Sequence, residues 1–299
     1  MTISAQQVKK LRQSTGVGMM ECKKALVENE GDMEKAILWL RERGMSRAAK
    51  KTGRTTAEGL VVYSIDEEKR AAAIVELNCE TDFAAKNADF QNFAKLLAKS
   101  ALNHKTKDCD SLNAVSLDGS ETVSYQLTQL IAKIGENISL RRVQYLELGQ
   151  NGAIFGYNHM GGKIGTLVCL EGQEQSELQD LGHDLAMHAA ASAPKYLDRT
   201  SVSTEELEQE KDLARKKLLD EGKPKDLVEK IVMGQMSKFY SEICFVDQPF
   251  VKEAKMSVAK YIKQVAPSAK LVSYVRFQLG EGVEVKKQNF AEEVQSQLK

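Results

Sequence analysis

Apolar residues recur at helical spacing in three short segments at the start of the chain and predict a three-helix unit over residues 1–46. Ser4 and Gln7 have the spacing of a capping box that starts the first helix. Gly16 is placed to end that helix, and Asp32 to cap the third. A unit of this size is marginal as an independent domain, so we expect a partner to cover some of its exposed apolar residues.

The basic run at 47–57 has no hydrophobic period and is interpreted as a linker with a solvated face. A different pattern begins with the first core subdomain, at 58–148. Runs rich in β-branched residues at 59–65 and 72–77 predict a hairpin, and 138–148 predicts a closing strand. Between them, two helices are predicted from apolar residues that share one face: Phe90, Phe93, Leu97 and Ala101 in the first, and Val123, Leu127, Leu130 and Ile134 in the second.

The same order of elements recurs in a second core subdomain, at 149–280. Residues 152–157 and 164–170 predict another hairpin, the segment around 178–189 a helix, and 271–279 the returning strand. We interpret this recurrence as an internal duplication. The fold class expected is therefore α+β, with two related subdomains and antiparallel sheets.

A helical hairpin is inserted in the second subdomain at 203–243, where a capping box opens a highly charged helix and a second amphipathic helix follows. Its two helices share one apolar stripe, which is too little for an independent core, so we expect the hairpin to need another surface such as a second copy of the chain. Residues 281–299 form a short amphipathic tail, interpreted as a C-terminal docking module.

Composition and charge narrow the function classes. The chain has 299 residues, with 42 Lys and Arg against 42 Asp and Glu, so its net charge is zero. It therefore lacks the overall positive charge that attracts the phosphate backbone of nucleic acids. Five widely spaced cysteines, with no C-x-x-C pair, argue against a disulfide framework or a thiolate metal site. No signal peptide or membrane-spanning segment is predicted, and we expect a cytoplasmic protein without membrane contact.

No catalytic, metal or nucleotide site is predicted within the chain. His183 and His188 are five residues apart and lie on different faces of a helix, so they cannot share a zinc ion. Asp184 and His188 have hydrogen-bonding spacing, but no nucleophile accompanies them, and a structural histidine is favoured. The glycine-containing segments at 16–21 and 156–163 lack the spacing of dinucleotide and phosphate loops. We therefore expect no cofactor and no direct nucleotide binding.

Thr81, Asp82 and Phe83 lie where a strand gives way to a helix, a place that favours a polar cap rather than a large ring. In one interpretation Phe83 is a buried anchor and Thr81 or Asp82 caps the helix. In the other, Phe83 is an exposed wedge and Asp82 a charge placed against another protein. Residue chemistry alone favours the buried ring, because aromatic side chains usually bury.

Motifs along nearly the whole chain resemble the bacterial elongation factor Ts family. Residues 79–86 read Cys-Glu-Thr-Asp-Phe-Ala-Ala-Lys, similar to the family signature, in which Val usually stands at the position of Ala84. Residues 11–26 resemble the family's N-terminal signature. Further matches follow in order at 134–138, 159–165, 186–191, 222–224 and 276–282.

This resemblance implies a ubiquitin-associated-like N-terminal domain, a duplicated core, a coiled-coil insertion that can mediate homodimers, and a C-terminal helix. It also implies a function: guanine nucleotide exchange on elongation factor Tu during translation elongation, without enzymatic chemistry. Two sets of contact residues carry over to this sequence: Arg12, Met19, Met20 and His159 on the nucleotide domain of the partner, and Thr81, Asp82, Phe83 and Ala84 near its magnesium site. Removal of GDP would then follow from disturbance of that site by Asp82 and Phe83.

Two alternatives from other function classes stay open. A ubiquitin-associated-like adaptor or ribosome-associated binding protein would account for the N-terminal helices and the basic run, but it leaves the duplicated core without a role. A hydrolase using Asp184 and His188 is the enzyme alternative, and it lacks most of the groups that such a site needs.

Overall fold

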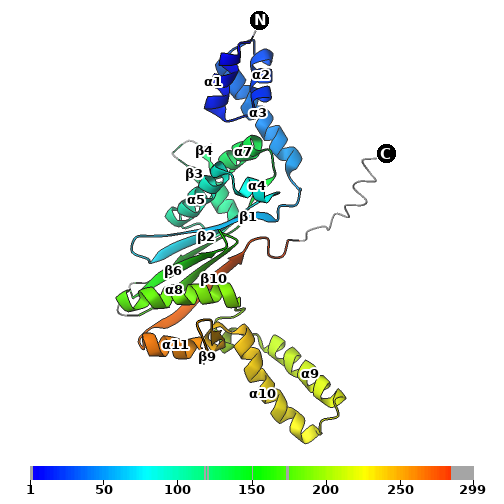
Figure 1. Ribbon diagram of the computed structural model, residues 1–299, viewed down its shortest axis with the longest axis vertical. Coiled ribbons are helices and arrows are strands. Elements are labelled where there is room, and N and C mark those ends of the chain that lie inside the picture. The colour runs from blue at the N-terminus through cyan, green and yellow to red at the C-terminus, as the bar shows by residue number, and fades with distance from the viewer. Residues whose placement is uncertain (1–2, 118, 120, 150, 173–174, 284–299) are drawn as a thin grey trace. The chain divides into compact units, whose positions relative to one another are not determined.

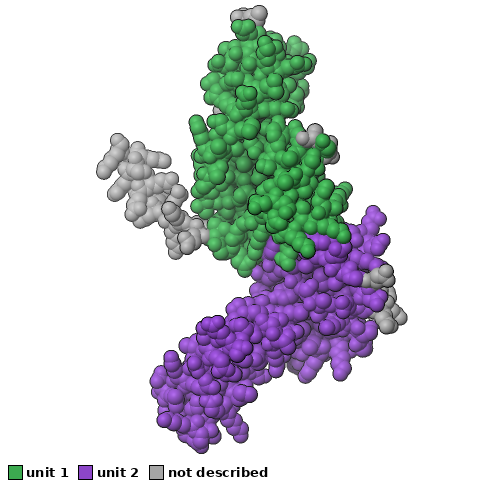
Figure 2. Space-filling view, turned by 180° about the vertical axis from the view of Figure 1, so that it is seen from behind, with its two compact units in different colours: residues 1–62, 75–144, 278–299 green, residues 63–74, 145–277 purple. Residues whose placement is uncertain are grey.

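The computed structural model describes residues 3–117, 119, 121–149, 151–172 and 175–283. Helices and small antiparallel sheets alternate along these residues, which confirms the predicted α+β class (Figure 1). Internal contacts divide the chain into two compact units, coloured separately in Figure 2. Unit 1 comprises Met1–Val62, Val75–Gln144 and Gln278–Lys299, and unit 2 comprises Tyr63–Ile74 and Tyr145–Phe277. This division follows contacts rather than chain order, and the boundaries proposed from the sequence stay a prediction.

Three helices form the N-terminal part of unit 1, namely α1 (Ala5–Thr15), α2 (Met19–Glu28) and α3 (Met33–Lys51). The predicted capping box is present, because the Ser4 side chain accepts a hydrogen bond from the Gln7 amide and Gln7 binds back to the Ser4 amide. The three helices enclose their own small core, made of Val8, Leu11, Cys22, Ala25, Leu26, Ala36 and Leu40.

The basic run predicted to be a linker is helical as far as Lys51, so that part of the prediction was wrong. Ala48 and its neighbours are good helix formers, and basic side chains in a last turn interact favourably with the helix dipole. Helix α3 packs on helix α7 (Val123–Ile134), where Gly44 lies against Ala132. Within the basic run Ala48 is buried, and one small buried residue gives no apolar period.

The first core hairpin and its closing strand form a three-stranded sheet in the order β1-β2-β5. Its strands are β1 (Glu58–Ile65), β2 (Ala71–Cys79) and β5 (Ile138–Glu147), and the helices between β2 and β5 are α4 (Asp82–Ala85), α5 (Ala88–Asn103), α6 (Cys109–Asn113) and α7. Two strands that were not predicted, β3 (Ser116–Leu117) and β4 (Glu121–Thr122), pair with each other before α7. The predicted elements of this segment are confirmed.

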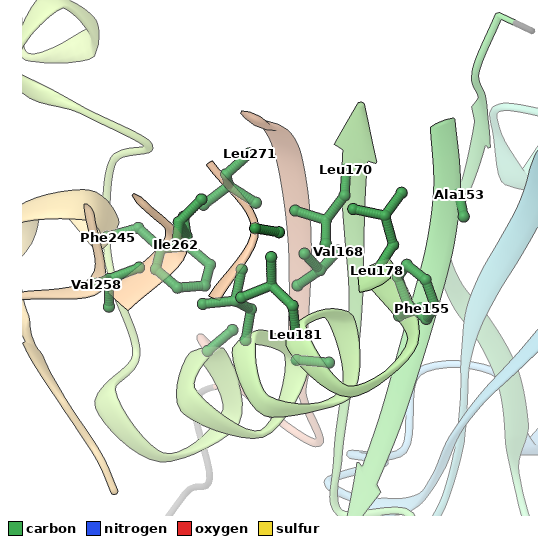
Figure 3. Packing of buried hydrophobic residues seen from close by; sticks show 14 of the residues in the cluster. Ala153, Phe155, Val168, Leu170, Leu178, Leu181, Phe245, Val258, Ile262 and Leu271 are labelled. Carbon is green, nitrogen blue, oxygen red and sulfur yellow. The ribbon is translucent and has the colours of Figure 1, made fainter. Parts of the chain in front are cut away.

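The second sheet repeats the arrangement in unit 2 with the order β10-β7-β6. Its strands are β6 (Gly152–His159), β7 (Ile164–Glu171) and β10 (Lys270–Gln278), and α8 (Gln175–Ser192) packs against β6 and β7. In both sheets the second hairpin strand lies between the first hairpin strand and the closing strand, as an internal duplication requires. Figure 3 shows the core beneath α8, where Leu178 and Leu181 meet Val168 and Leu170 of β7. Elements that were not predicted add to this core: Phe250 of β8 (Pro249–Phe250) and Val258 and Ile262 of α11 (Val258–Val265). Between them, β9 (Glu253–Ser257) pairs with β8.

The insertion is an antiparallel helical hairpin, α9 (Thr204–Asp220) and α10 (Lys225–Ile243). One apolar seam joins the two helices, made of Ala214, Leu218, Val228, Val232 and Met236. At its base the amides of Lys195 and Tyr196 both donate to the carbonyl of Ile243, at 2.9 and 3.0 Å, and the amide of Phe245 donates to Tyr196 at 2.8 Å. The two ends of the insertion therefore meet on the unit 2 core.

None of the described helices is long and apolar enough to cross a membrane. The tail predicted at 281–299 as a docking module lies, from residue 284 onward, outside the described residues.

Candidate functional site

A four-residue helix, α4, carries the predicted contact residues immediately after β2. Thr81 is its N-cap: the Thr81 hydroxyl accepts a hydrogen bond from the Ala84 amide at 3.2 Å. Asp82 is free of the capping role and pairs instead with Lys86, whose Nζ lies 2.7 Å from its carboxylate. The hydrogen bond from Lys86 holds the pKa of Asp82 below its usual value, so the turn presents a carboxylate that remains ionised at neutral pH.

Phe83 projects from this turn with 80% of its surface exposed. The next two residues, Ala84 and Ala85, are buried and fill the space beneath the turn. Because one helical turn cannot direct three successive side chains to the same side, burial of these alanines leaves the ring outside. The buried-anchor interpretation was wrong, and the predicted exposure of Phe83 is confirmed.

Side chains from a distant segment hold the turn in place. Both oxygens of the Glu136 carboxylate accept hydrogen bonds from Thr81, one from its amide at 3.0 Å and one from its hydroxyl at 2.7 Å. In the reverse direction Glu80 accepts from the Asn137 amide at 2.5 Å. The Asn137 side chain donates to the carbonyl of Arg54 at 2.9 Å, which ties in the end of the N-terminal segment. The exposed ring therefore stands on a fixed base.

The sequence reasoning did not assign these anchoring roles to Glu136 and Asn137. The available signal was the motif at 134–138, which was recognised only as part of the family resemblance. Its carboxylate and amide follow the helix-ending Gly135, where they face the start of α4. Cys79 beneath the turn is no nucleophile, because burial raises the pKa of its thiol to about 12.

Arg12, Met19 and Met20 form a second group of exposed side chains within unit 1. Arg12 lies in the last turn of α1, and the two methionines open α2, with 40% of Met19 and 76% of Met20 exposed. Large apolar side chains at such exposure are typical of surfaces that a partner covers.

His159 belongs to unit 2, at the end of β6, and its side chain is exposed. The Tyr157 hydroxyl lies 3.1 Å from His159 Nδ1, and the two rings stack with centroids 5.9 Å apart. These contacts fix the direction of the imidazole without burying it.

Asp184 and His188, the pair considered for hydrolysis, each bind other residues instead of one another. His188 is fully buried, and its ring binds Gln248 through Nε2 at 3.0 Å while Nδ1 accepts from the Val251 amide at 3.2 Å. Asp184 is instead bound by Lys252 and by the Tyr261 hydroxyl. Burial lowers the pKa of His188, as expected for a neutral structural histidine. The described residues contain no cluster of three or more His, Cys, Asp or Glu side chains suited to a metal ion.

Comparison with known proteins places these residues in a family. A model of the family described as "Elongation factor TS" matches residues 80–281, more than half of the chain, and one described as "Elongation factor Ts, mitochondrial, N-terminal" matches residues 1–55. The chain belongs to the elongation factor Ts family. Its relatives include the proteins named "Elongation factor Ts" from Clostridium tetani, 47% identical, and from Clostridium novyi, 45% identical. Each alignment covers 99% of this chain and 99% of the relative.

Membership of the elongation factor Ts family implies nucleotide exchange on elongation factor Tu, an activity of translation elongation. The matched segments include the whole Phe83 turn and the Arg12–Met20 region. They also include the duplicated core from residue 80 onward, and the adaptor alternative gave this core no role.

Proposed function

We propose that this chain binds elongation factor Tu carrying GDP and uses the turn at Thr81, Asp82 and Phe83 to disturb the magnesium and phosphate site of that partner. GDP then leaves and GTP enters. The observation that supports this role most directly is the 80% exposure of Phe83 on a turn whose base is fixed by Glu136.

Phe83 supplies the driving force for insertion. Transfer of a phenylalanine side chain from water into an apolar site is favourable by about 1.5–3 kcal/mol. Because the base of the turn is already ordered by Thr81 and Glu136, little of this free energy is spent on fixing the turn when it binds. Ala84 below the ring is smaller than the Val usual in the family, yet it is buried and the turn is intact.

Asp82 supplies an electrostatic disturbance. Magnesium bridges phosphate oxygens to protein loops and is the largest local charge in a nucleotide site, so displacement of those loops removes much of what holds GDP. A carboxylate whose pKa is lowered by Lys86 keeps its charge as it approaches that site.

Binding of nucleotide and binding of the exchange factor to elongation factor Tu are thermodynamically coupled, so exchange is reversible and each factor molecule can act repeatedly. A protein that prefers the nucleotide-free form of its partner weakens nucleotide binding by the same factor by which nucleotide weakens its own binding. GTP that enters the emptied site therefore helps to release the exchange factor.

The remaining contacts in this proposal belong to both units. Arg12, Met19 and Met20 bind the nucleotide domain of elongation factor Tu from unit 1, and His159 binds it from unit 2. The hairpin α9–α10 is available for a homodimer contact. The proposal places the activity in the cytoplasm and requires no cofactor, nucleic acid or nucleotide site of the chain's own.

Release of fluorescently labelled GDP from elongation factor Tu tests the central claim. At a fixed subsaturating concentration of the factor, Phe83→Ala is expected to slow release by about 10- to 100-fold, the equivalent of the transfer free energy of the ring. Asp82→Ala is expected to slow it as well. Val265→Ala, which truncates an exposed apolar side chain on α11, is the matched control. Wild-type rates in both turn variants would sink the assignment.

A further inference from the structure

One lysine at the end of α7 contacts two segments that are far apart in the sequence. Lys133 Nζ lies 2.8 Å from a carboxylate oxygen of Asp89 in the first turn of α5. On its other side the Lys133 stem covers Gly16, where an added Cβ would lie 2.6 Å from Lys133 Cε. Gly16 ends α1 with φ +68°, so the backbone there is both left-handed and closely covered.

These two segments lead directly to the two groups of exposed contact residues in unit 1. Gly16 separates Arg12, at the end of α1, from Met19, at the start of α2. Asp89 follows Phe83 closely, and the segment between them is ordered by Asn87, which caps α5 by accepting from the Asp89 amide at 2.8 Å. The Lys133 side chain therefore links the segment between Arg12 and Met19 to the start of α5, the helix that follows the Phe83 turn.

The N-terminal helices also contact the core directly, because α3 packs on α7. Gly44 lies against Ala132, and an added Cβ there would lie 3.0 Å from the Ala132 side chain. Arg41 reaches Glu121 at 4.0 Å, with both side chains largely exposed. Exposed pairs of this kind contribute little. The Lys133 and Asp89 side chains are exposed to a similar degree, 38% and 46%, so their ion pair matters less for its own energy than for holding the Lys133 stem against Gly16.

We infer that Lys133 is a positioning residue that fixes the spacing between the Arg12–Met20 surface and the Phe83 turn, so that elongation factor Tu meets both at once. This inference rests on the proposed function. Two binding surfaces held at the correct spacing act as one, because the second contact forms at a high effective concentration. A looser spacing weakens binding although no contact with the partner is removed.

Nucleotide exchange measured against factor concentration tests this role. Lys133→Met keeps the stem and removes the charge. It is expected to raise the half-saturating concentration by about three- to tenfold and leave the rate at saturation unchanged. Lys133→Arg should restore most of the loss, and Lys95→Met, at an exposed position of α5, is the matched control.

A double-mutant cycle separates positioning from simple destabilisation. In a background that already lacks the N-terminal contacts, Arg12→Ala with Met20→Ala, Lys133→Met should have almost no further effect, because only one surface remains to be bound. An equal loss in both backgrounds would overturn the inference.

A distance measurement tests Lys133 independently of exchange. Spin labels are attached at Lys24→Cys on α2 and Lys99→Cys on α5, both exposed, in a Cys109→Ser background. The distance distribution is expected to be narrow in the parent and broader with Lys133→Met. An unchanged distribution would overturn the inference even if Phe83→Ala slows exchange. A broadened distribution together with wild-type exchange by Phe83→Ala would instead leave Lys133 in place and reject the proposed function.

Discussion

Glu76 lies in the middle of β2 with none of its surface exposed, and its charge is matched by neighbours from two other segments. Arg141 Nη1 lies 3.0 Å from one carboxylate oxygen, and Arg142 Nε binds the other. The amide of Gly280 donates to the carboxylate at 2.9 Å. The buried carboxylate thus fastens the segment after β10 to the centre of β2.

Replacement of Glu76 by Ala is expected to lower the free energy of unfolding of unit 1 by about 3 kcal/mol. Removal of one partner from a buried ion pair costs about 3–5 kcal/mol. The lower end applies here, because the Arg141 and Arg142 side chains are 27% and 29% exposed and regain some hydration. For a protein of this size the melting temperature should fall by roughly 6–12 °C.

The destabilisation caused by Glu76→Ala should become smaller as the pH is lowered. Burial alone would raise the pKa of Glu76, but the hydrogen bonds from Gly280, Arg142 and Arg141 together outweigh it, and the pKa is lowered from 4.5. A carboxylate whose pKa is lower in the folded protein than in the unfolded chain stabilises the fold at pH values above its unfolded-state pKa. This contribution is lost as the pH falls through its folded-state pKa. The difference between wild type and Glu76→Ala should therefore be full at pH 7 and shrink below about pH 4.5.

Thermal unfolding followed by circular dichroism at pH 7, 5 and 3 measures both effects. Glu67→Ala, which removes an exposed glutamate from the same hairpin, is the matched control and should change the free energy of unfolding by less than about 0.5 kcal/mol. A Glu76→Ala protein that melts with the wild type at pH 7, or a difference that stays constant down to pH 3, would refute the reasoning.

Two further predictions concern the turn and the buried histidine. Thr81→Ala removes the cap of α4 and a bond to Glu136, so it should cost about 1 kcal/mol and slow GDP release although Phe83 is present, whereas Thr81→Ser should behave as wild type. Fast release by Thr81→Ala would show that the anchor is dispensable. Burial lowers the pKa of His188, so below pH 6.5 the unfolded chain takes up a proton at this residue more readily than the folded protein does. The free energy of unfolding should therefore be highest above pH 6.5 and decline as the pH falls below it. Urea unfolding between pH 7.5 and 5.5 should show this decline in the wild type and not in His188→Gln, and equal slopes in both would contradict it.

Elements with strong local signals could be predicted from the sequence. The capping box at Ser4 and Gln7, the helix end at Gly16 and the alternation in the two hairpins each act within a few residues. The segment 249–265 was missed although Val258, Ile262 and Val265 stand at helical spacing, because α11 has only eight residues and the strands before it are too short to show a period. Phe250 and Val258 are buried by contact with the rest of unit 2. The basic end of α3 was missed because its alanines and basic residues show no apolar period, although Ala48 is buried.

The exposure of Phe83 could not be obtained from local residue chemistry, which favoured a buried ring. What decides it is the burial of Ala84 and Ala85 beneath the turn and the anchoring of Thr81 by Glu136, a residue 55 positions away. Contacts across that distance are not visible in spacing or composition. The family motifs pointed to the correct orientation because they span both segments.

The hydrogen bonds at the base of the α9–α10 hairpin bear on which insertions and sequence changes this protein can tolerate. Because the amides of Lys195 and Tyr196 converge on the carbonyl of Ile243, the chain leaves the unit 2 core and returns to it at nearly one point. The hairpin is therefore an insertion whose two ends lie side by side. Its length or sequence can vary while the strands on either side keep their register. Natural variation and protein engineering can both use that site, for instance to carry a reporter domain, at little risk to the sheet that bears His159.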